Sequence, residues 1–206
     1  MIFERGQRIV FIGDSITDSG RREEDPPYGN GYMSLVRAFV PAARPDIGLQ
    51  WTNQGINGNT VRELRDRWDS DAIAAAPDWL SVMIGINDVW RAFDGWPELA
   101  VPIDEYESTL KNLLQRAVDE TGCRLILATP FLIEPDRDDP QRAQSDRYGA
   151  VVRKLAGDFD AVAVDTQEAF DRVLVHTTST DWADDRVHPN LPGHAVLAQA
   201  FLSAIG

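Results

Sequence analysis

The chain has 206 residues, 43% of them apolar and 26% charged, and a formal net charge of −13 at pH 7. This length and composition are typical of a globular protein with a full hydrophobic core, so we expect residues 1–206 to form one domain. The acidic balance argues against nucleic acid or an anionic membrane as a partner, because both bind basic surfaces.

Two features of the sequence indicate the cellular compartment. No apolar run approaches the roughly 18 residues that a membrane span needs, and Met1–Arg5 shows neither the basic stretch nor the apolar core of a secretory signal. The single cysteine, Cys123, cannot form an intramolecular disulfide and begins an apolar run, which predicts a buried thiol. We therefore expect a cytoplasmic protein.

Strands and helices alternate in the first half of the chain. Arg8–Ile12 predicts a strand, Gly31–Val40 a helix with Leu35, Val36 and Phe39 facing inward, and Leu49–Asn53 a second strand. The next helix is predicted over Thr60–Ala75, with a capping box of Thr60 and Glu63 and with Val61, Leu64, Trp68 and Ala72 on its buried face. A third strand is predicted over Trp79–Ile84.

The same alternation continues in the second half. A helix over Ile103–Glu120 has the inward stripe Ile103, Tyr106, Leu110, Leu113, Leu114 and Ala117 and stops at Gly122. Then come a strand at Arg124–Thr129, a helix within Ser145–Asp158 with Tyr148, Val151, Val152 and Leu155 inward, a strand at Ala161–Val164, and a helix over Leu191–Ile205 with Val196, Leu197, Ala200, Phe201 and Ala204 inward. Five strands alternating with helices predict an α/β fold, a three-layer α/β/α sandwich with a five-stranded parallel sheet.

A small hydroxyl follows the first predicted strand. The apolar run ends abruptly at Gly13-Asp14-Ser15, which places Ser15 at an edge of the sheet where a substrate can reach it. A serine alone is a poor nucleophile and needs a base. The alternative is a serine that only caps the helix or turn after the strand.

A candidate base lies near the other end of the chain, where Asp185 precedes His188 by three residues. An imidazole can accept the serine proton and return it to a leaving alcohol, since its pKa of about 6.5 lies near working pH. An aspartate beside it holds the tautomer. His176 and His194 lack such a partner pattern, and Asp184 lacks the spacing. Ser15, His188 and Asp185 therefore have the composition of an acyl-transfer triad, the alternative being an ordinary polar turn.

Four segments resemble the ordered blocks of the SGNH hydrolases, also called GDSL esterases. They are Gly13-Asp14-Ser15-Ile16-Thr17, Asn53–Thr60, Gly85–Asp88 and Asp185–His188, and they span nearly the whole chain. The resemblance implies the flavodoxin-like fold of that family. It also implies that the negative charge of a tetrahedral intermediate is bound by the backbone N–H groups of Ser15 and Gly58 and the side-chain amide of Asn87.

A narrower resemblance concerns the substrate. The segments Met83–Arg91, Thr129–Glu134, Asp165–Asp171 and Arg186–Pro189 look like those of the intracellular acetylxylan esterases of xylan-degrading bacteria. This implies a serine esterase that removes acetyl groups from carbohydrates through an acyl-enzyme, with acetylated xylooligosaccharides as the leading substrate. We expect Asp14, Trp90 and Trp182 to contact the substrate, since aromatic faces stack well on sugar rings. We also expect a homo-oligomer, in which Glu134–Asp139 borders either the site or a subunit contact.

Other classes of function fit the sequence less well. Three scattered histidines offer no zinc-ligand spacing, and an aspartyl-nucleophile phosphatase would have a carboxylate where Ile16 stands. The first strand is not followed by the Gly-x-Gly-x-x-Gly of a dinucleotide site, so we expect no metal and no cofactor. Two alternatives stay open: a short-chain lipid esterase, lysophospholipase or thioesterase of the same fold, and a carbohydrate-binding oligomer without activity. The absence of an apolar lid segment disfavours the first, and the presence of every catalytic part disfavours the second.

Overall fold

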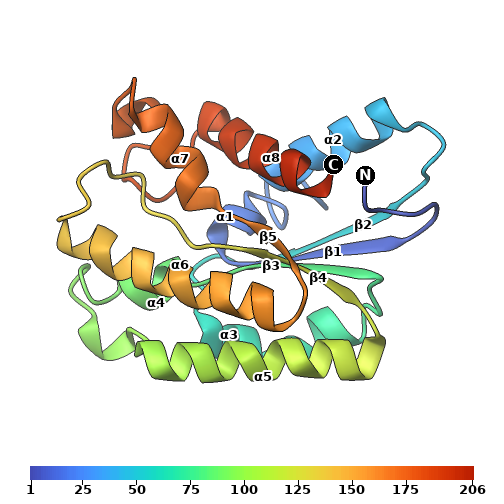
Figure 1. Ribbon diagram of the computed structural model, residues 1–206, viewed down its shortest axis with the longest axis horizontal. Helices are drawn as coiled ribbons and strands as arrows, with labels where there is room; N and C mark the ends of the chain where they lie inside the picture. The colour runs from blue at the N-terminus through green and yellow to red at the C-terminus, as the bar shows by residue number, and fades with distance from the viewer.

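The computed structural model describes all 206 residues and has the predicted three layers (Figure 1). Its middle layer is a sheet of five parallel strands in the order β2-β1-β3-β4-β5. The strands are β1 (Arg8–Gly13), β2 (Gln50–Gly55), β3 (Trp79–Met83), β4 (Arg124–Ala128) and β5 (Val162–Val164). The α/β/α fold class and the five predicted strands are confirmed, and only the strand ends differ, by one or two residues.

Helices cover both faces of the sheet (Figure 1). One face carries α1 (Ser15–Asp18), α2 (Tyr32–Ala43), α7 (Thr166–Leu174) and α8 (Leu191–Ile205), and the other carries α3 (Val61–Asp66), α4 (Ile86–Trp90), α5 (Ile103–Thr121) and α6 (Pro140–Asp158). Side chains of a strand point alternately to its two faces. Ile9 and Phe11 therefore join the core beneath α2 and α8, whereas Val10 and Ile12 join the core beneath α3, α5 and α6.

Helix ends that depend only on the local sequence lie where they were predicted. Thr60 and Glu63 form the capping box at the start of α3, and Gly122 ends α5 in the left-handed conformation with φ 70°. Cys123 is buried, as expected. The final helix, α8, has the predicted bounds.

Two expectations about the helices are wrong. Phe39 is 56% exposed, because the buried stripe of α2 runs through Tyr32, Met33, Val36 and Val40 and leaves Phe39 on the outer side. The helix predicted over Thr60–Ala75 breaks after Asp66 and continues as a wide π turn at Asp69–Ile73. That wider turn keeps Trp68 and Ala72 in the core while Arg67 leaves the helical register.

One further helix is longer than predicted, and another was not predicted. The helix predicted within Ser145–Asp158 begins earlier, at Pro140, where Asp139 caps it. The helix α7 was not predicted at all, and short 3-10 turns occur at Pro97–Leu99 and Ser179–Asp181. No helix of the protein is both long and apolar enough to cross a membrane.

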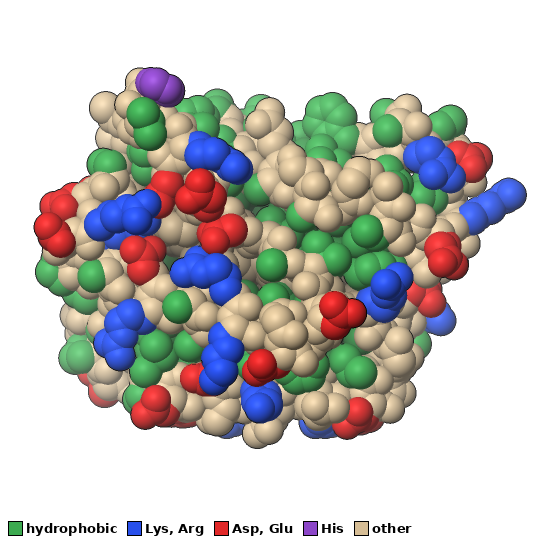
Figure 2. Space-filling model, viewed as in Figure 1, with side chains coloured by type: hydrophobic (Ala, Val, Ile, Leu, Met, Phe, Trp, Pro, Cys, Tyr) green, Lys and Arg blue, Asp and Glu red, His purple; other side chains and the backbone are tan.

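Charged side chains of both signs are interspersed over α6 and α7 (Figure 2). Several of them form ion pairs, among them Arg137 and Arg142 with Asp171, and Arg153 with Asp165. This face therefore presents no continuous basic patch (Figure 2).

The close crossing of β2 and α1 provides a test of the fold. A Cβ on Gly55 would overlap the backbone nitrogen of Asp18, whereas a Cβ on Gly157 in α6 would meet no atom within 4 Å. Gly55→Ala is expected to lower the free energy of unfolding by about 3 kcal/mol or to prevent folding. Gly157→Ala, the matched control, should raise it by about 0.5–1 kcal/mol. Denaturant unfolding of both variants checks this, and equal stabilities would contradict the packing described.

Candidate active site

The order of the strands reverses at β1, which lies between β2 and β3. In open parallel sheets, ligand sites form beyond the carboxyl ends of the strands at such a point. Ser15 follows β1, Gly58 follows β2 and Asn87 follows β3. The topology therefore brings to one edge of the sheet three residues that are far apart in sequence.

Ser15 is the first residue of α1, and Asp14 is the residue that caps this helix. The carboxylate of Asp14 accepts a hydrogen bond of 3.0 Å from the Ile16 N–H. The capping role that Ser15 could have had belongs to Asp14, which leaves the Ser15 hydroxyl free for another partner. That partner is His188, whose Nε2 lies 3.0 Å from the Ser15 Oγ.

The imidazole of His188 is in turn held by Asp185. Its Nδ1 lies 2.6 Å from one carboxylate oxygen of Asp185, and the other oxygen accepts from the His188 and Val187 N–H groups at 2.8 and 2.9 Å. Partial burial acts to raise the pKa of Asp185, but the hydrogen bonds from His188 and Val187 outweigh it and lower this pKa below its usual value. A charged carboxylate only accepts, so Nδ1 carries the proton and the Nε2 lone pair faces the Ser15 hydroxyl.

The turn that carries this pair is anchored through Arg186, which has a left-handed backbone with φ 67°. Its guanidinium donates to the carboxylates of Glu134 and Asp139 at 2.8 and 3.2 Å, and its carbonyl accepts from the Ile133 N–H at 2.8 Å. The segment Glu134–Asp139, which was expected to border either the site or a subunit contact, therefore packs against the turn between Asp185 and His188. These contacts offset the cost of a left-handed non-glycine residue.

The loop after β2 is shaped to expose a backbone N–H at Gly58. The φ of Gly58 is +76°, and a Cβ there would meet no atom within 4 Å. Glycine is therefore favoured here by the left-handed backbone conformation and not by a lack of space. Its N–H donates to no group of the protein. The Ser15 N–H, first in its helix, likewise has no intrahelical partner.

Asn87 in α4 and Arg91, which follows α4, hold this loop from the other side. The Asn87 amide donates one N–H to the Asn59 carbonyl at 3.0 Å, which orients the side chain and leaves its second N–H free. The Arg91 guanidinium donates to the Gly58 carbonyl at 2.7 Å. This contact of Arg91, and those of Arg67 with the Gly13 and Gln54 carbonyls, were not predicted, because an arginine at a helix end carries no local signal of the carbonyl that it will reach.

Two buried carboxyl groups lie beside the loop. Asp88 accepts from the Val61 N–H at 3.0 Å through one oxygen, and its other oxygen has no hydrogen-bond partner. Burial, with a smaller contribution from the charge of Asp14, raises the pKa of Asp88 to about 7 against the hydrogen bond from Val61. Burial likewise raises the pKa of Asp14 to about 7. Both groups are acids that ionise reluctantly.

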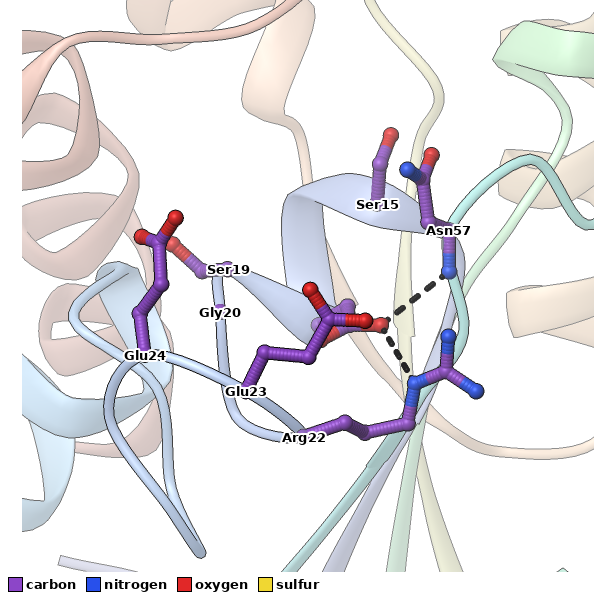
Figure 3. A pocket seen from close by; sticks show the side chains of 8 residues that line it. Ser15, Ser19, Gly20, Arg22, Glu23, Glu24 and Asn57 are labelled. Atoms are coloured by element: carbon purple, nitrogen blue, oxygen red, sulfur yellow. Dashed lines mark hydrogen bonds and ion pairs between the residues drawn. The ribbon is translucent and has the colours of Figure 1, made fainter.

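Two cavities meet at Ser15. The smaller, of about 230 Å³, is lined by Ser15, Asn57 and the loop from Ser19 to Glu24 (Figure 3). In it, Asp18 accepts from the Asn57 N–H at 3.2 Å and pairs with Arg22 at 3.3 Å (Figure 3). The larger, of about 470 Å³, lies on the other side of Ser15 and is also lined by His188 and the start of α8. Ser15 is thus accessible from both.

The three residues expected to contact substrate are placed differently from one another. The ring of Trp90 is partly exposed, with its centroid 5.4 Å from that of His188. Asp14 is only 1% exposed, caps α1 and lines neither cavity. Trp182 lines neither cavity, and its indole N–H donates to Thr177 at 2.8 Å. No group of three or more His, Cys, Asp or Glu side chains is arranged to hold a metal ion.

A hydroxyl, an imidazole and a carboxylate in this hydrogen-bonded order, at the switch point of a parallel sheet, define the class of serine-dependent hydrolases. Comparison with known proteins agrees. The family model described as GDSL-like Lipase/Acylhydrolase family matches residues 11–196. This chain belongs to that family, as the sequence blocks indicated, and it is a carboxylic ester hydrolase.

Individual relatives are similar over their whole length. An acetylxylan esterase from Geobacillus stearothermophilus is 45% identical over 208 residues, which cover 98% of this chain and 94% of that protein. The crystal structure of an acetylxylan esterase from the same organism gives a TM-score of 0.96 at 45% identity, covering 100% of this chain and 97% of its own. Catalytic mutants of that enzyme replace a serine, an aspartate or a histidine by alanine. An alpha/beta hydrolase enzyme from the metagenome of Lake Arreo, Spain, gives 0.95 at 44% identity, covering 100% and 98%.

The buried acid Asp88 makes stability depend on pH. Its pKa is about 7 in the folded protein and near the ordinary 3.8 in the unfolded chain, so between these values the folded state holds a proton that the unfolded chain has lost. The contribution of Asp88 to the free energy of unfolding is therefore full below pH 3.8 and falls as the pH rises to about 7. Asp88→Asn removes this dependence, and its gain in unfolding free energy should be on the order of 1–4 kcal/mol larger at pH 8 than at pH 4.

Denaturant unfolding at the two pH values, compared with the wild type, measures this difference. Asp94→Asn is the control, because Asp94 is exposed and its side chain makes no hydrogen bond. An Asp88→Asn gain that is equal at pH 4 and pH 8 would show that Asp88 ionises normally in the folded protein.

Proposed function

We propose that the protein is a serine esterase that removes O-acetyl groups from carbohydrates, with acetylated xylooligosaccharides as its substrates. The observation that carries the proposal is the chain of hydrogen bonds from Ser15 through His188 to Asp185. The similarity to an acetylxylan esterase supports the choice of substrate. The net charge of −13 suits a neutral sugar ester better than an anionic one.

In the proposed mechanism, Ser15 attacks the acetyl carbonyl while His188 takes the proton of its hydroxyl. The negative charge on the carbonyl oxygen is bound by the Ser15 and Gly58 N–H groups and by the free N–H of the Asn87 amide. His188 then gives its proton to the leaving sugar oxygen, and an acetyl-enzyme remains. Water attacks it by the same route in reverse, with Asp185 stabilising the imidazolium in both steps.

We further propose that residues 1–206 act as one domain, in the cytoplasm and as a homo-oligomer. A single buried thiol, Cys123, is compatible with a reducing compartment. Phe93, Trp96 and Leu99 are 43–56% exposed within one short segment, and an apolar surface of this kind suits a contact between subunits.

The effects of substituting Asp185 and its neighbour Asp184 test the assignment of the triad. Asp185→Asn is expected to lower kcat by about 10⁴-fold, because the wrong tautomer of His188 then faces Ser15. Asp184→Asn, the control, changes an exposed side chain without a hydrogen bond and should leave kcat within twofold. Ser15→Ala should abolish turnover in a folded protein. Steady-state kinetics with 4-nitrophenyl acetate would reject the assignment if Asp184→Asn were the more damaging change.

The role of Asn87 predicts a particular kinetic pattern. Asn87→Ala should lower kcat by roughly 10²–10³-fold, which is the usual cost of one oxyanion donor, with a smaller effect on KM. A variant with unchanged kcat and a greatly raised KM would show that Asn87 binds ground-state substrate instead.

The acyl group is the test that separates the proposed function from a lipid esterase or thioesterase. Each methylene that cannot enter a small acyl site loses about 0.8 kcal/mol of favourable burial and adds a clash. The value of kcat/KM should therefore fall steeply over 4-nitrophenyl esters of two, four and eight carbons, and acetate should be released from acetylated xylooligosaccharides. A maximum at eight carbons would favour a lipid esterase or thioesterase. A two-carbon maximum without acetate release from any acetylated sugar would keep the mechanism and remove the carbohydrate substrate.

A further inference from the structure

The two cavities at Ser15 differ in whether His188 forms part of the wall. His188 lines the larger cavity, of about 470 Å³, but not the smaller one of about 230 Å³. Sites for small molecules usually measure about 300–1,000 Å³, so the larger cavity has the size of a ligand site.

The chemistry of the leaving group decides between them. His188 Nε2, 3.0 Å from the Ser15 Oγ, has to pass its proton to the oxygen that leaves. That oxygen must therefore lie beside Nε2, and the group attached to it extends into the cavity that His188 lines. We propose that the larger cavity, between α1, Asn30 and the start of α8, binds the sugar that leaves as the alcohol. This inference rests on the proposed function.

The walls of the larger cavity have the two kinds of surface that a sugar ring needs. Ile16, Pro189 and Leu191 supply apolar surface for the C–H faces of the ring, and Ser19 and Asn30 supply polar groups for its hydroxyls. The smaller cavity has no hydrophobic lining residue and contains the charged side chains of Arg22, Glu23 and Glu24 (Figure 3). A neutral ring matches the first lining better than the second.

The polar wall is held in one arrangement before any ligand binds. His194 Nδ1 accepts from the Tyr32 N–H at 3.2 Å, so Nε2 carries the proton and faces the Ser19 Oγ at 3.4 Å. Ser19 Oγ in turn donates to the Asn30 side-chain oxygen at 3.0 Å. Burial lowers the pKa of His194 to about 4, which keeps the ring neutral in this role. The Ser19 oxygen is left with one lone pair to accept from a substrate hydroxyl.

The reverse of the leaving step gives a direct test. An alcohol in the larger cavity can attack the acetyl-enzyme in place of water: its oxygen bonds to the acetyl carbon, its proton passes to His188, and the bond from carbon to the Ser15 Oγ breaks as Oγ takes that proton back. The fraction of acetyl groups transferred to a sugar rather than to water then measures occupation of the cavity.

The experiment uses 4-nitrophenyl acetate as the acetyl donor and xylose or methanol as the acceptor, with products quantified by NMR. Leu191→Ala removes the exposed apolar wall, and Ser19→Gly removes the hydroxyl at a residue whose φ of 44° glycine adopts without strain. Each should lower transfer to xylose relative to water by about three- to tenfold. Transfer to methanol, which is too small to reach either wall, should change by less than twofold.

Glu24→Gln, in the smaller cavity, is the control and should leave the xylose ratio unchanged. A fall in that ratio for Glu24→Gln but not for Leu191→Ala would place the sugar in the smaller cavity; Ser19 lines both cavities, so Leu191 is the residue that separates them. No transfer to xylose by the wild-type protein, or equal losses with xylose and methanol, would also overturn the proposal. Acetate release from acetylated xylooligosaccharides is measured separately: release without these changes in partition overturns only the subsite, whereas no release overturns the proposed function.

Discussion

The guanidinium of Arg67 is the interaction on which the geometry of the site depends. It donates to the last carbonyl of β1, at Gly13, and to the carbonyl of Gln54 in β2, both at 2.8 Å. It also donates to the Asn59 side chain at 2.7 Å, while Asp71 pairs with it at 2.8 Å. Ser15 is two residues beyond Gly13 and Gly58 adjoins Asn59, so one rigid planar group sets the distance between the nucleophile turn and the loop that exposes Gly58. A lysine could not replace it, because an ammonium lacks the fixed fork of donors.

The helix α4 and the residue that follows it complete this arrangement with three side chains that reach the same loop. Asn87 and Arg91 bond to the carbonyls of Asn59 and Gly58, and Asp88 accepts from the N–H of Val61 at the start of α3. Burying Asp88 opposes its ionisation, and the protein tolerates this because the carboxyl meets an unpaired N–H at a helix start, as Asp14 does at α1. The orientation of the loop is thus maintained at a cost in stability, a compromise that is common at functional sites.

The third part of the site depends on a single carboxylate. Asp185 accepts from two backbone N–H groups of its own turn as well as from the His188 ring, so the fold of the turn and the orientation of the imidazole cannot change independently. Arg186 connects this turn to the N-terminal end of α6 through Glu134 and Asp139. The base is therefore fixed to a long helix, although it lies in an irregular segment.

Features that depend on residues close together in the chain could be predicted from the sequence. The strands, the Thr60 capping box, the stop at Gly122 and the Asp185–His188 pair each depend on residues a few positions apart, and periodicity or spacing reports such contacts directly. Other features are visible only in the folded protein: Ser15 contacts His188, 173 residues away, and Arg67, just past the end of α3, bonds to carbonyls of two strands. The burial of Asp14 and the exposure of Phe39 belong to the same group. These features depend on the strand order and on which helix covers which face, and a one-dimensional pattern carries no record of either.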